Sequence, residues 1–209
     1  MNRSLTTIAA LVLPCVMELE GAVVPAASGS PEASLTLTVY IFNSARIPNW
    51  RLARIQKRVS EYFLGAGIRL EWVDRTPVSS NRRGYTANPE EVDPSDLILR
   101  IVPRFDLRAE GLRSSVFGFA AESQITIINE RTEEVAQNAE ATLPEILAIV
   151  IAHELGHALL GPDSHSENGI MRPRLQAADF KKAQRKTLVF TPEQAERMRS
   201  KVSQLKNHR

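Results

Sequence analysis

The amino-acid sequence predicts an α+β fold, in which a mixed, twisted β-sheet packs against helices and one helix is buried. Three observations support this class. Between residues 35 and 102, segments with strand alternation and helix periodicity follow in the order strand, helix, strand, strand. Residues 143–160 are apolar on nearly every side, which indicates a helix in the interior. Two shorter helical patterns follow it and form a small C-terminal part.

The length and charge of the chain limit its class. With 209 residues, the chain suits one compact domain and a leader. Its formal net charge is +2, and it has no basic stripe with interleaved aromatic residues. The sequence therefore predicts no nucleic-acid partner. Nothing in it indicates an oligomeric state.

The first residues have the pattern of a secretory leader. Residues 1–26 resemble a signal peptide, with Arg3 ahead of an uncharged, mostly apolar run that is too short to cross a bilayer. We expect cleavage after Ala26, a flexible linker at 27–34 and a single folded domain at 35–209. This organisation predicts a secreted or periplasmic protein with no stable membrane insertion after cleavage.

The only cysteine, Cys15, lies in this leader. It follows Leu13 and Pro14, which make a poor lipoprotein signature, so we do not expect a lipid anchor. Because no cysteine remains after cleavage, the fold must depend on its core, aided by a bound metal, rather than on disulfides.

Five segments are expected in the first part of the domain. They are strands at 35–42, 68–73 and 97–102, a helix at 48–64, and a long loop at 74–95 that is rich in Pro, Asn, Ser and Arg. In the helix, apolar residues recur at i, i+3, i+7 and i+11 from Leu52 to Phe63, which defines its buried face. Its charged residues are expected to form the solvated face.

Three more segments lead up to the buried helix. Strands are predicted at 116–120 and 124–128, and a bridging helix, a candidate lid, at 131–141. The first of these strands contains Gly118 and no charged residue. In an ordinary sheet strand, such a glycine marks a bulge.

The buried helix has defined ends. Thr142 suits the N-cap, Pro144 falls in the first turn, and Glu145 lies at the positive end of the helix dipole. Gly161 permits the left-handed conformation that ends a helix, and Pro162 cannot continue the hydrogen bonding. The helix therefore ends just after a group of polar residues.

In that group, His153 and His157 enclose Glu154 in the pattern His-Glu-x-x-His. Histidines four residues apart share one helix face, so their two imidazoles can bind one small cation. In zinc hydrolases with this spacing, the carboxylate after the first histidine, here Glu154, activates the metal-bound water. The chain then turns back, and His165 is the natural third donor. Three protein ligands and an open water position predict one catalytic Zn²⁺.

Other residues compete for the third position. The C-terminal part is expected to form helices at 175–184 and 192–205, and both carry carboxylates. Neutral imidazole is the commoner zinc ligand, which favours His165, but the spacing does not decide. The alternative donors are Asp163 in the turn, Asp179 on the first of these helices, and Glu193 and Glu196 on the second.

The stretch from His153 to Pro173 resembles the metzincin clan of zinc peptidases, and most closely its matrixin-type and archaemetzincin-like branches. These families share the pattern His-Glu-x-x-His-x-x-Gly-x-x-His, followed by a turn that holds a methionine beneath the metal. In this chain Gly161 comes one residue later than in that pattern and His165 two residues later, while Met171 falls in a similar Met-turn. The longer string also resembles a group of predicted bacterial secreted zincins.

The resemblance implies a zincin-like fold and a secreted metallopeptidase that hydrolyses peptide bonds, with Glu154 as the base. It implies that Met171 packs and does not bind the metal. It also implies that the strand at 116–120 lines the cleft and pairs with an extended peptide substrate. The alternative is the ordinary sheet strand with a bulge at Gly118, and the sequence favours neither of the two. The shifted spacing keeps two other functions open: a non-catalytic metal- or peptide-binding protein of this fold, and a zinc hydrolase of another amide.

Overall fold

The computed structural model describes residues 35–76, 92–105, 117–138 and 141–207. The predicted signal peptide and linker lie outside the described residues, as does most of the predicted loop at 74–95. The elements are β1 (Leu35–Asn43), α1 (Asn49–Gly65), β2 (Ile68–Asp74), β3 (Leu97–Val102), β4 (Gly118–Ala121), β5 (Gln124–Ile128), α2 (Asn129–Asn138), α3 (Leu143–Leu160), α4 (Ala177–Gln184) and α5 (Pro192–Asn207).

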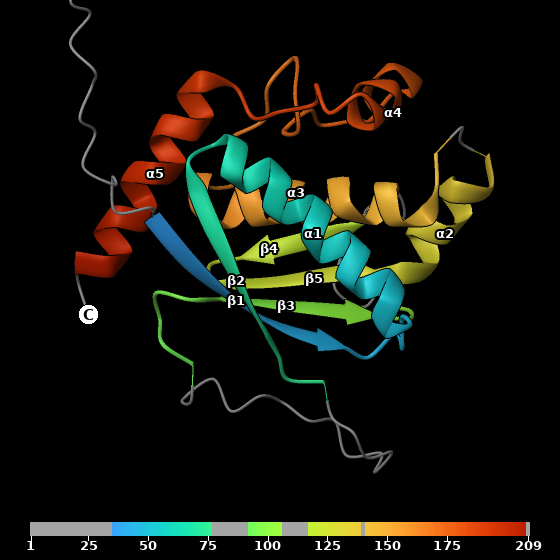
Figure 1. Cartoon of the computed structure of the whole chain (residues 1–209), viewed down its shortest axis with the longest axis horizontal. Helices are drawn as coiled ribbons and strands as arrows, with labels where there is room; N and C mark the ends of the chain where they lie inside the picture. The colour runs from blue at the N-terminus through green and yellow to red at the C-terminus, as the bar shows by residue number, and fades with distance from the viewer. Residues whose placement is uncertain (1–34, 77–91, 106–116, 139–140, 208–209) are drawn as a thin grey trace, which may run out of the picture. The chain divides into compact units, whose positions relative to one another are not determined.

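The five strands form one mixed sheet in the order β2-β1-β3-β5-β4 (Figure 1). Four of them run parallel, and β4 pairs antiparallel with β5 at one end of the sheet. The α+β class and the mixed sheet are thus confirmed. Pairing is continuous from Gly118, opposite Ile127, to Ala121, opposite Gln124, so Gly118 does not mark a bulge.

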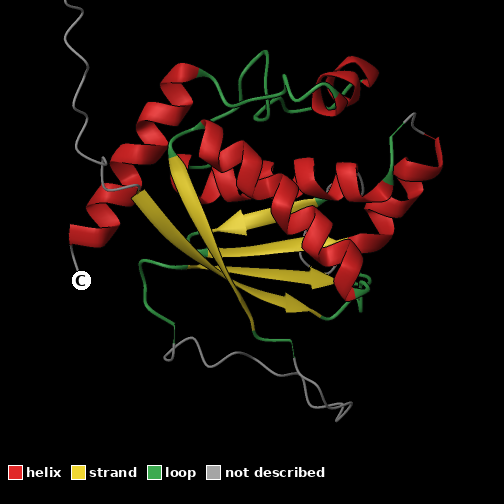
Figure 2. Ribbon diagram, in the orientation of Figure 1, coloured by secondary structure: helices red, strands yellow, loops and turns green. Residues whose placement is uncertain are grey.

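Helices α1 and α3 lie on the same face of the sheet (Figure 2). The alternating residues Leu37, Val39 and Ile41 of β1 are fully buried and belong to one core cluster with residues of both helices. A smaller cluster, centred on Phe42 and Ile98, is formed by residues of β1 and β3 outside the main core. The alternation therefore places most of the apolar surface between the sheet and the helices.

Helix α3 is the central helix of this core. The backbone N–H of Thr142 donates to the Glu145 carboxylate at 2.9 Å, as expected for a capped start, and the segment from Ile146 to Ala152 is buried throughout. Of the described helices, it alone is long and apolar enough to span a membrane. Its residues pack inside the domain, which accounts for that composition.

The C-terminal helices differ slightly from their predicted bounds. Helix α4 begins at Ala177 rather than at 175, because the N–H of Gln176 donates to the Asp179 carboxylate at 2.9 Å and caps the helix. Helix α5 is anchored to the core by Ala195, Met198 and Val202, and it continues to Asn207. Helix α2 begins at Asn129, two residues before the predicted start, and ends at Asn138.

Candidate active site

The end of α3 carries three of the four predicted site residues. Glu154 is buried there, and His153 and His157 are half-buried one turn apart. Gly161 follows the last helical residue with φ +93°, and its N–H donates to the His157 carbonyl at 2.8 Å. Such a conformation favours glycine, and it turns the chain out of the helix axis immediately after His157.

The three predicted histidines converge on one point. The Nε2 atom of His157 lies 3.1 Å from the Nε2 atom of His153 and 3.1 Å from that of His165. One ligand atom from each ring lies within 4.8 Å of the others. A single zinc ion about 2.1 Å from each nitrogen requires separations of about 3–4 Å, which both distances from His157 meet, so the geometry suits one small cation.

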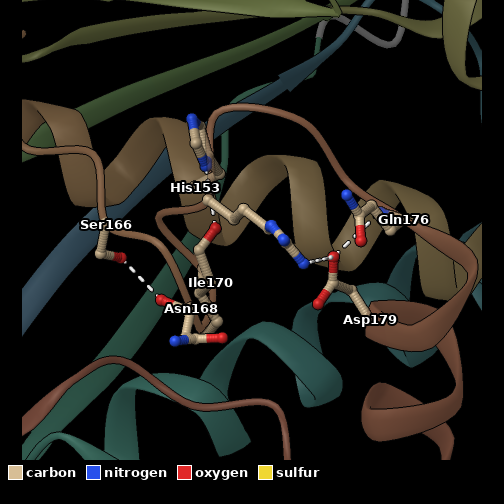
Figure 3. Close-up of polar contacts among 7 residues, drawn as sticks. His153, Ser166, Asn168, Ile170, Gln176 and Asp179 are labelled. Carbon is tan, nitrogen blue, oxygen red and sulfur yellow. Dashed lines mark hydrogen bonds and ion pairs between the residues drawn. The ribbon is translucent and has the colours of Figure 1, made fainter.

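The other ring nitrogens fix the protonation of two of these imidazoles. Nδ1 of His153 lies 2.9 Å from the Ile170 carbonyl oxygen (Figure 3), and Nδ1 of His157 lies 3.0 Å from the Gly161 carbonyl oxygen. A carbonyl only accepts, so each Nδ1 carries the hydrogen and each Nε2 carries a lone pair. Burial lowers the pKa of His153 to about 4, and burial also lowers the pKa of His157, which keeps both rings neutral at pH 7.

Two lone pairs that face each other at 3.1 Å repel, whereas a cation between them binds both. The donor set therefore fits a zinc ion by its chemistry as well as by its spacing. Imidazole nitrogens are ligands that Zn²⁺ prefers, and backbone carbonyls are common partners for the opposite ring nitrogen.

Met171 packs against the helix that carries two of these histidines. It is fully buried against α3, and a Cβ added to Gly156 would lie 2.4 Å from its Sδ atom. Two residues earlier, Gly169 has φ +84°, and an added Cβ there would lie 2.5 Å from the Val189 carbonyl oxygen. The same oxygen accepts the N–H of Ile170 at 3.1 Å, which holds the carbonyl that receives His153.

Glu154 lies on a different side of α3, against the end strand of the sheet. Its side chain is 9% exposed, and burial raises its pKa to about 7. A Cβ added to Gly118 of β4 would lie 3.2 Å from Cγ of Glu154 and 2.6 Å from the Thr126 carbonyl oxygen. Glycine at this position thus lets β4 approach the helix beside the carboxylate.

The alternative donors are not brought to the three histidines. Asp163 is exposed in the turn, and Glu193 and Glu196 are exposed on α5. Asp179 is fully buried, but its carboxylate accepts the N–H of Gln176 (Figure 3) and pairs with Arg172 at 3.4 Å. In the described parts of the chain, the one possible metal-binding group is His153, His157 and His165.

A shallow pocket adjoins the third histidine. Its volume is about 590 Å³, and it is formed by the chain from His165 to Asn168 together with Arg172 and Pro173.

Sequence reasoning did not identify Ile170, Ser164 and Gln194 as parts of this site. The Ser164 hydroxyl donates to the Gly161 carbonyl at 2.7 Å and lies 3.1 Å from Nδ1 of His157. Gln194 of α5 contacts the backbone of the same loop. These contacts join segments up to 30 residues apart, and no local sequence pattern predicts them.

Two solved structures are similar to this one. A zinc-dependent peptidase from Methanocorpusculum labreanum aligns with 77% of this chain and 99% of its own, with a TM-score of 0.52 and 15% identity. The archaemetzincin from Methanopyrus kandleri aligns with 82% of this chain and 98% of its own, with a TM-score of 0.49 and 19% identity. At 15% identity, the first likeness concerns the fold alone. No protein-family model matches the sequence, and no curated protein does.

Proposed function

We propose that the chain is a zinc metallopeptidase of the metzincin-like endopeptidase type, with one catalytic ion. The observation that carries this proposal is the convergence of three imidazole Nε2 atoms, two of them with their Nδ1–H bonded to backbone carbonyls. A structural zinc takes a fourth protein ligand, whereas a catalytic zinc keeps a position open. The described residues supply three donors and no fourth, which favours catalysis.

His153, His157 and His165 would hold the ion through their Nε2 atoms. When bound, zinc supplies a Lewis acid that acts on water and on the carbonyl of a scissile amide. Glu154 follows His153 directly in α3, and its Cγ lies close to Gly118 of β4, so the side chain is held between the helix and the end strand. A buried acid that follows the first of three imidazole ligands in the chain is a candidate for the base of a hydrolytic site.

Glu154 is the proton carrier in this proposal. Its carboxylate takes a proton from the water whose oxygen forms the new bond to the carbonyl carbon. When the C–N bond breaks, Glu154 returns that proton to the leaving amine nitrogen. One water is consumed, and a carboxylic acid and an amine are released, which at neutral pH are present as a carboxylate and an ammonium.

The surroundings of the site suit an extended peptide. Strand β4 ends the sheet beside Glu154, and among the described residues it pairs only with β5. An extended substrate can therefore add to its outer edge by backbone hydrogen bonds. The pocket that begins at His165 can receive one of its side chains. Peptide or protein substrates are accordingly proposed.

Export completes the proposal. The signal peptide predicted at 1–26 supports a secreted or periplasmic enzyme that acts after cleavage and carries no lipid anchor. Fractionation of expressing cells, with N-terminal sequencing of the mature chain, tests this part. Retention of residues 1–26 on a cytoplasmic protein would contradict it.

Peptidase activity and metal content are tested together. Purified mature protein should contain one zinc per chain by elemental analysis and should cleave denatured protein, and a chelator should abolish that cleavage. Glu154→Gln should keep the zinc and lose turnover. Glu196→Gln, an exposed glutamate on α5, is the matched control and should behave as the unaltered protein.

The outcomes separate the rival functions. Zinc without cleavage of any peptide would favour a non-catalytic metal- or peptide-binding protein. Zinc with cleavage confined to non-peptide amides would favour a different hydrolase. Full peptidase activity in Glu154→Gln would refute Glu154 as the base.

A further inference from the structure

The third histidine is held differently from the other two. His153 and His157 lie on a buried helix, whereas His165 is exposed and lies on the loop that follows α3. No helix or strand fixes its backbone, so the loop must be held by contacts on either side of it. Those contacts are present: the Ser164 carbonyl accepts a hydrogen bond from Gln194, and the Ser166 N–H donates to the Met171 carbonyl at 3.0 Å.

Gln194 is a buried polar residue whose amide is bonded at both ends. Its side chain is 5% exposed, its Oε1 accepts the Thr191 N–H at 3.1 Å, and its Nε2 donates to the Ser164 carbonyl at 3.1 Å. The neighbouring core residues Ala195 and Met198 hold α5 against the domain. The amide therefore joins the loop to a fixed element.

Two further contacts extend this connection. Arg197, one turn further along α5, donates to the Leu160 carbonyl at 3.0 Å, where the loop leaves α3. The Ser164 hydroxyl lies 3.1 Å from Nδ1 of His157 and donates to the Gly161 carbonyl that accepts the same ring. Ser164 thus contacts His157 through its hydroxyl and α5 through its carbonyl.

From these contacts we infer that Gln194 is a positioning residue, which holds His165 and, through Ser164, His157 in register for binding one metal ion. This inference rests on the proposed zinc site. It assigns a role in metal binding to a buried residue of α5. The acids close to it in sequence, Glu193 and Glu196, are exposed on the other face of that helix. Gln194 is not a ligand, and it acts only through the backbone of the loop.

Two substitutions separate its contacts. Gln194→Glu keeps the oxygen that accepts the Thr191 N–H but offers the Ser164 carbonyl no N–H. Gln194→Met keeps the buried volume and removes both bonds. Two controls leave the bond to Ser164 in place: Thr191→Ala weakens only the helix cap, and Glu196→Gln alters an exposed position.

The experiment measures zinc affinity of the full mature chain by competition with a chromophoric chelator, and the visible spectrum of the cobalt-substituted protein. Circular dichroism of the metal-free variants checks their folding. Loss of a partner outside the ligand set weakens metal binding by about 10- to 100-fold, and we expect both Gln194 variants to fall in this range. Their cobalt spectra should also change, while both controls keep the affinity and spectrum of the unaltered protein.

Failure of the proposed zinc site and failure of the role of Gln194 give different results. If the unaltered protein binds no zinc, the proposed function falls, and this inference with it. If the unaltered protein binds zinc and a folded Gln194 variant binds it equally well with an unchanged cobalt spectrum, only the role of Gln194 is overturned. Should Gln194→Met fail to fold, Gln194→Glu decides the question, because it retains the helix cap.

Discussion

Replacing Gly156 by alanine tests how closely Met171 packs beneath α3. The added Cβ would lie 2.4 Å from Sδ and 3.3 Å from Cε of Met171, and 3.2 Å from Cε1 of Phe190. Met171 is fully buried and Phe190 is 5% exposed, so neither side chain can swing into solvent. The substitution therefore requires the buried Met171 side chain, or the turn that carries it, to move away from the helix.

Two contributions of opposite sign determine how much Gly156→Ala changes the free energy of unfolding. Alanine is favoured over glycine within a helix by about 0.8–1.0 kcal/mol. Overpacking of a well-packed core by one methyl group costs about 1–3 kcal/mol. The contact with Sδ is shorter than real Cβ contacts, which places the overpacking cost in the upper half of its range. We expect a net loss of about 1–2 kcal/mol in the free energy of unfolding.

Zinc binding should weaken as well. Met171 follows Ile170, whose carbonyl receives Nδ1 of His153, so a shift of the turn misplaces that ring. The expected loss of zinc affinity is about 10-fold. Urea unfolding of the metal-free protein measures the free energy of unfolding, and chelator competition measures the zinc affinity.

Gly65 provides the matched control. It is the last residue of α1, is exposed, and an alanine Cβ there would meet nothing within 4 Å. Gly65→Ala should be neutral or slightly stabilising and should leave zinc affinity unchanged. A Gly156→Ala variant that is as stable as Gly65→Ala and binds zinc normally would refute the argument from packing.

Three further predictions concern the same site. Gly118→Ala should lower the free energy of unfolding by about 2 kcal/mol in urea, because the added Cβ would lie 2.6 Å from the Thr126 carbonyl oxygen and a backbone atom cannot rotate away. The same substitution should lower kcat, because Cγ of Glu154 lies beside Gly118. Saturating zinc, at about 100 times its Kd, should raise Tm by about 5–10 °C in calorimetry, and a chelator should reverse the shift. Asp163→Asn should keep one zinc per chain, whereas His165→Ala should lose it; the opposite result would make Asp163 the third ligand.

The sequence predicted the parts of the fold that local chemistry determines. The capped start at Thr142 and the glycine at 161 bound α3 as expected, because both features act within one helical turn. The histidine triad was also predictable, since a spacing of four on a helix and a short turn limit where the rings can go. The position of Asp179 shows the limit of such reasoning. Its carboxylate was a candidate ligand, but the fold uses it to cap α4 and to pair with Arg172.

The contacts between distant segments were not predictable from the sequence. Gln194 shares the buried face of α5 with Met198 and Val202, four and eight residues further on, but this spacing does not predict that its amide bonds to Ser164. In the same way, the approach of Gly118 to Glu154 depends on the antiparallel pairing of β4 at the end of the sheet. Such contacts follow from tertiary packing, which has no period along the chain.

The geometry of α3 separates metal binding from proton transfer. Glu154 and Gly156 are two residues apart, which places them about 200° apart around the helix axis, on nearly opposite sides. The Gly156 side contacts Met171 and the turn that holds a ligand, so changes there should act on zinc affinity. The Glu154 side contacts Gly118 of β4, so changes there should act on turnover while zinc stays bound. If Gly118→Ala weakened zinc binding as much as Gly156→Ala does, the two sides of the helix would not be independent. The assignment of Glu154 as a base distinct from the metal-binding group would then lose its structural basis.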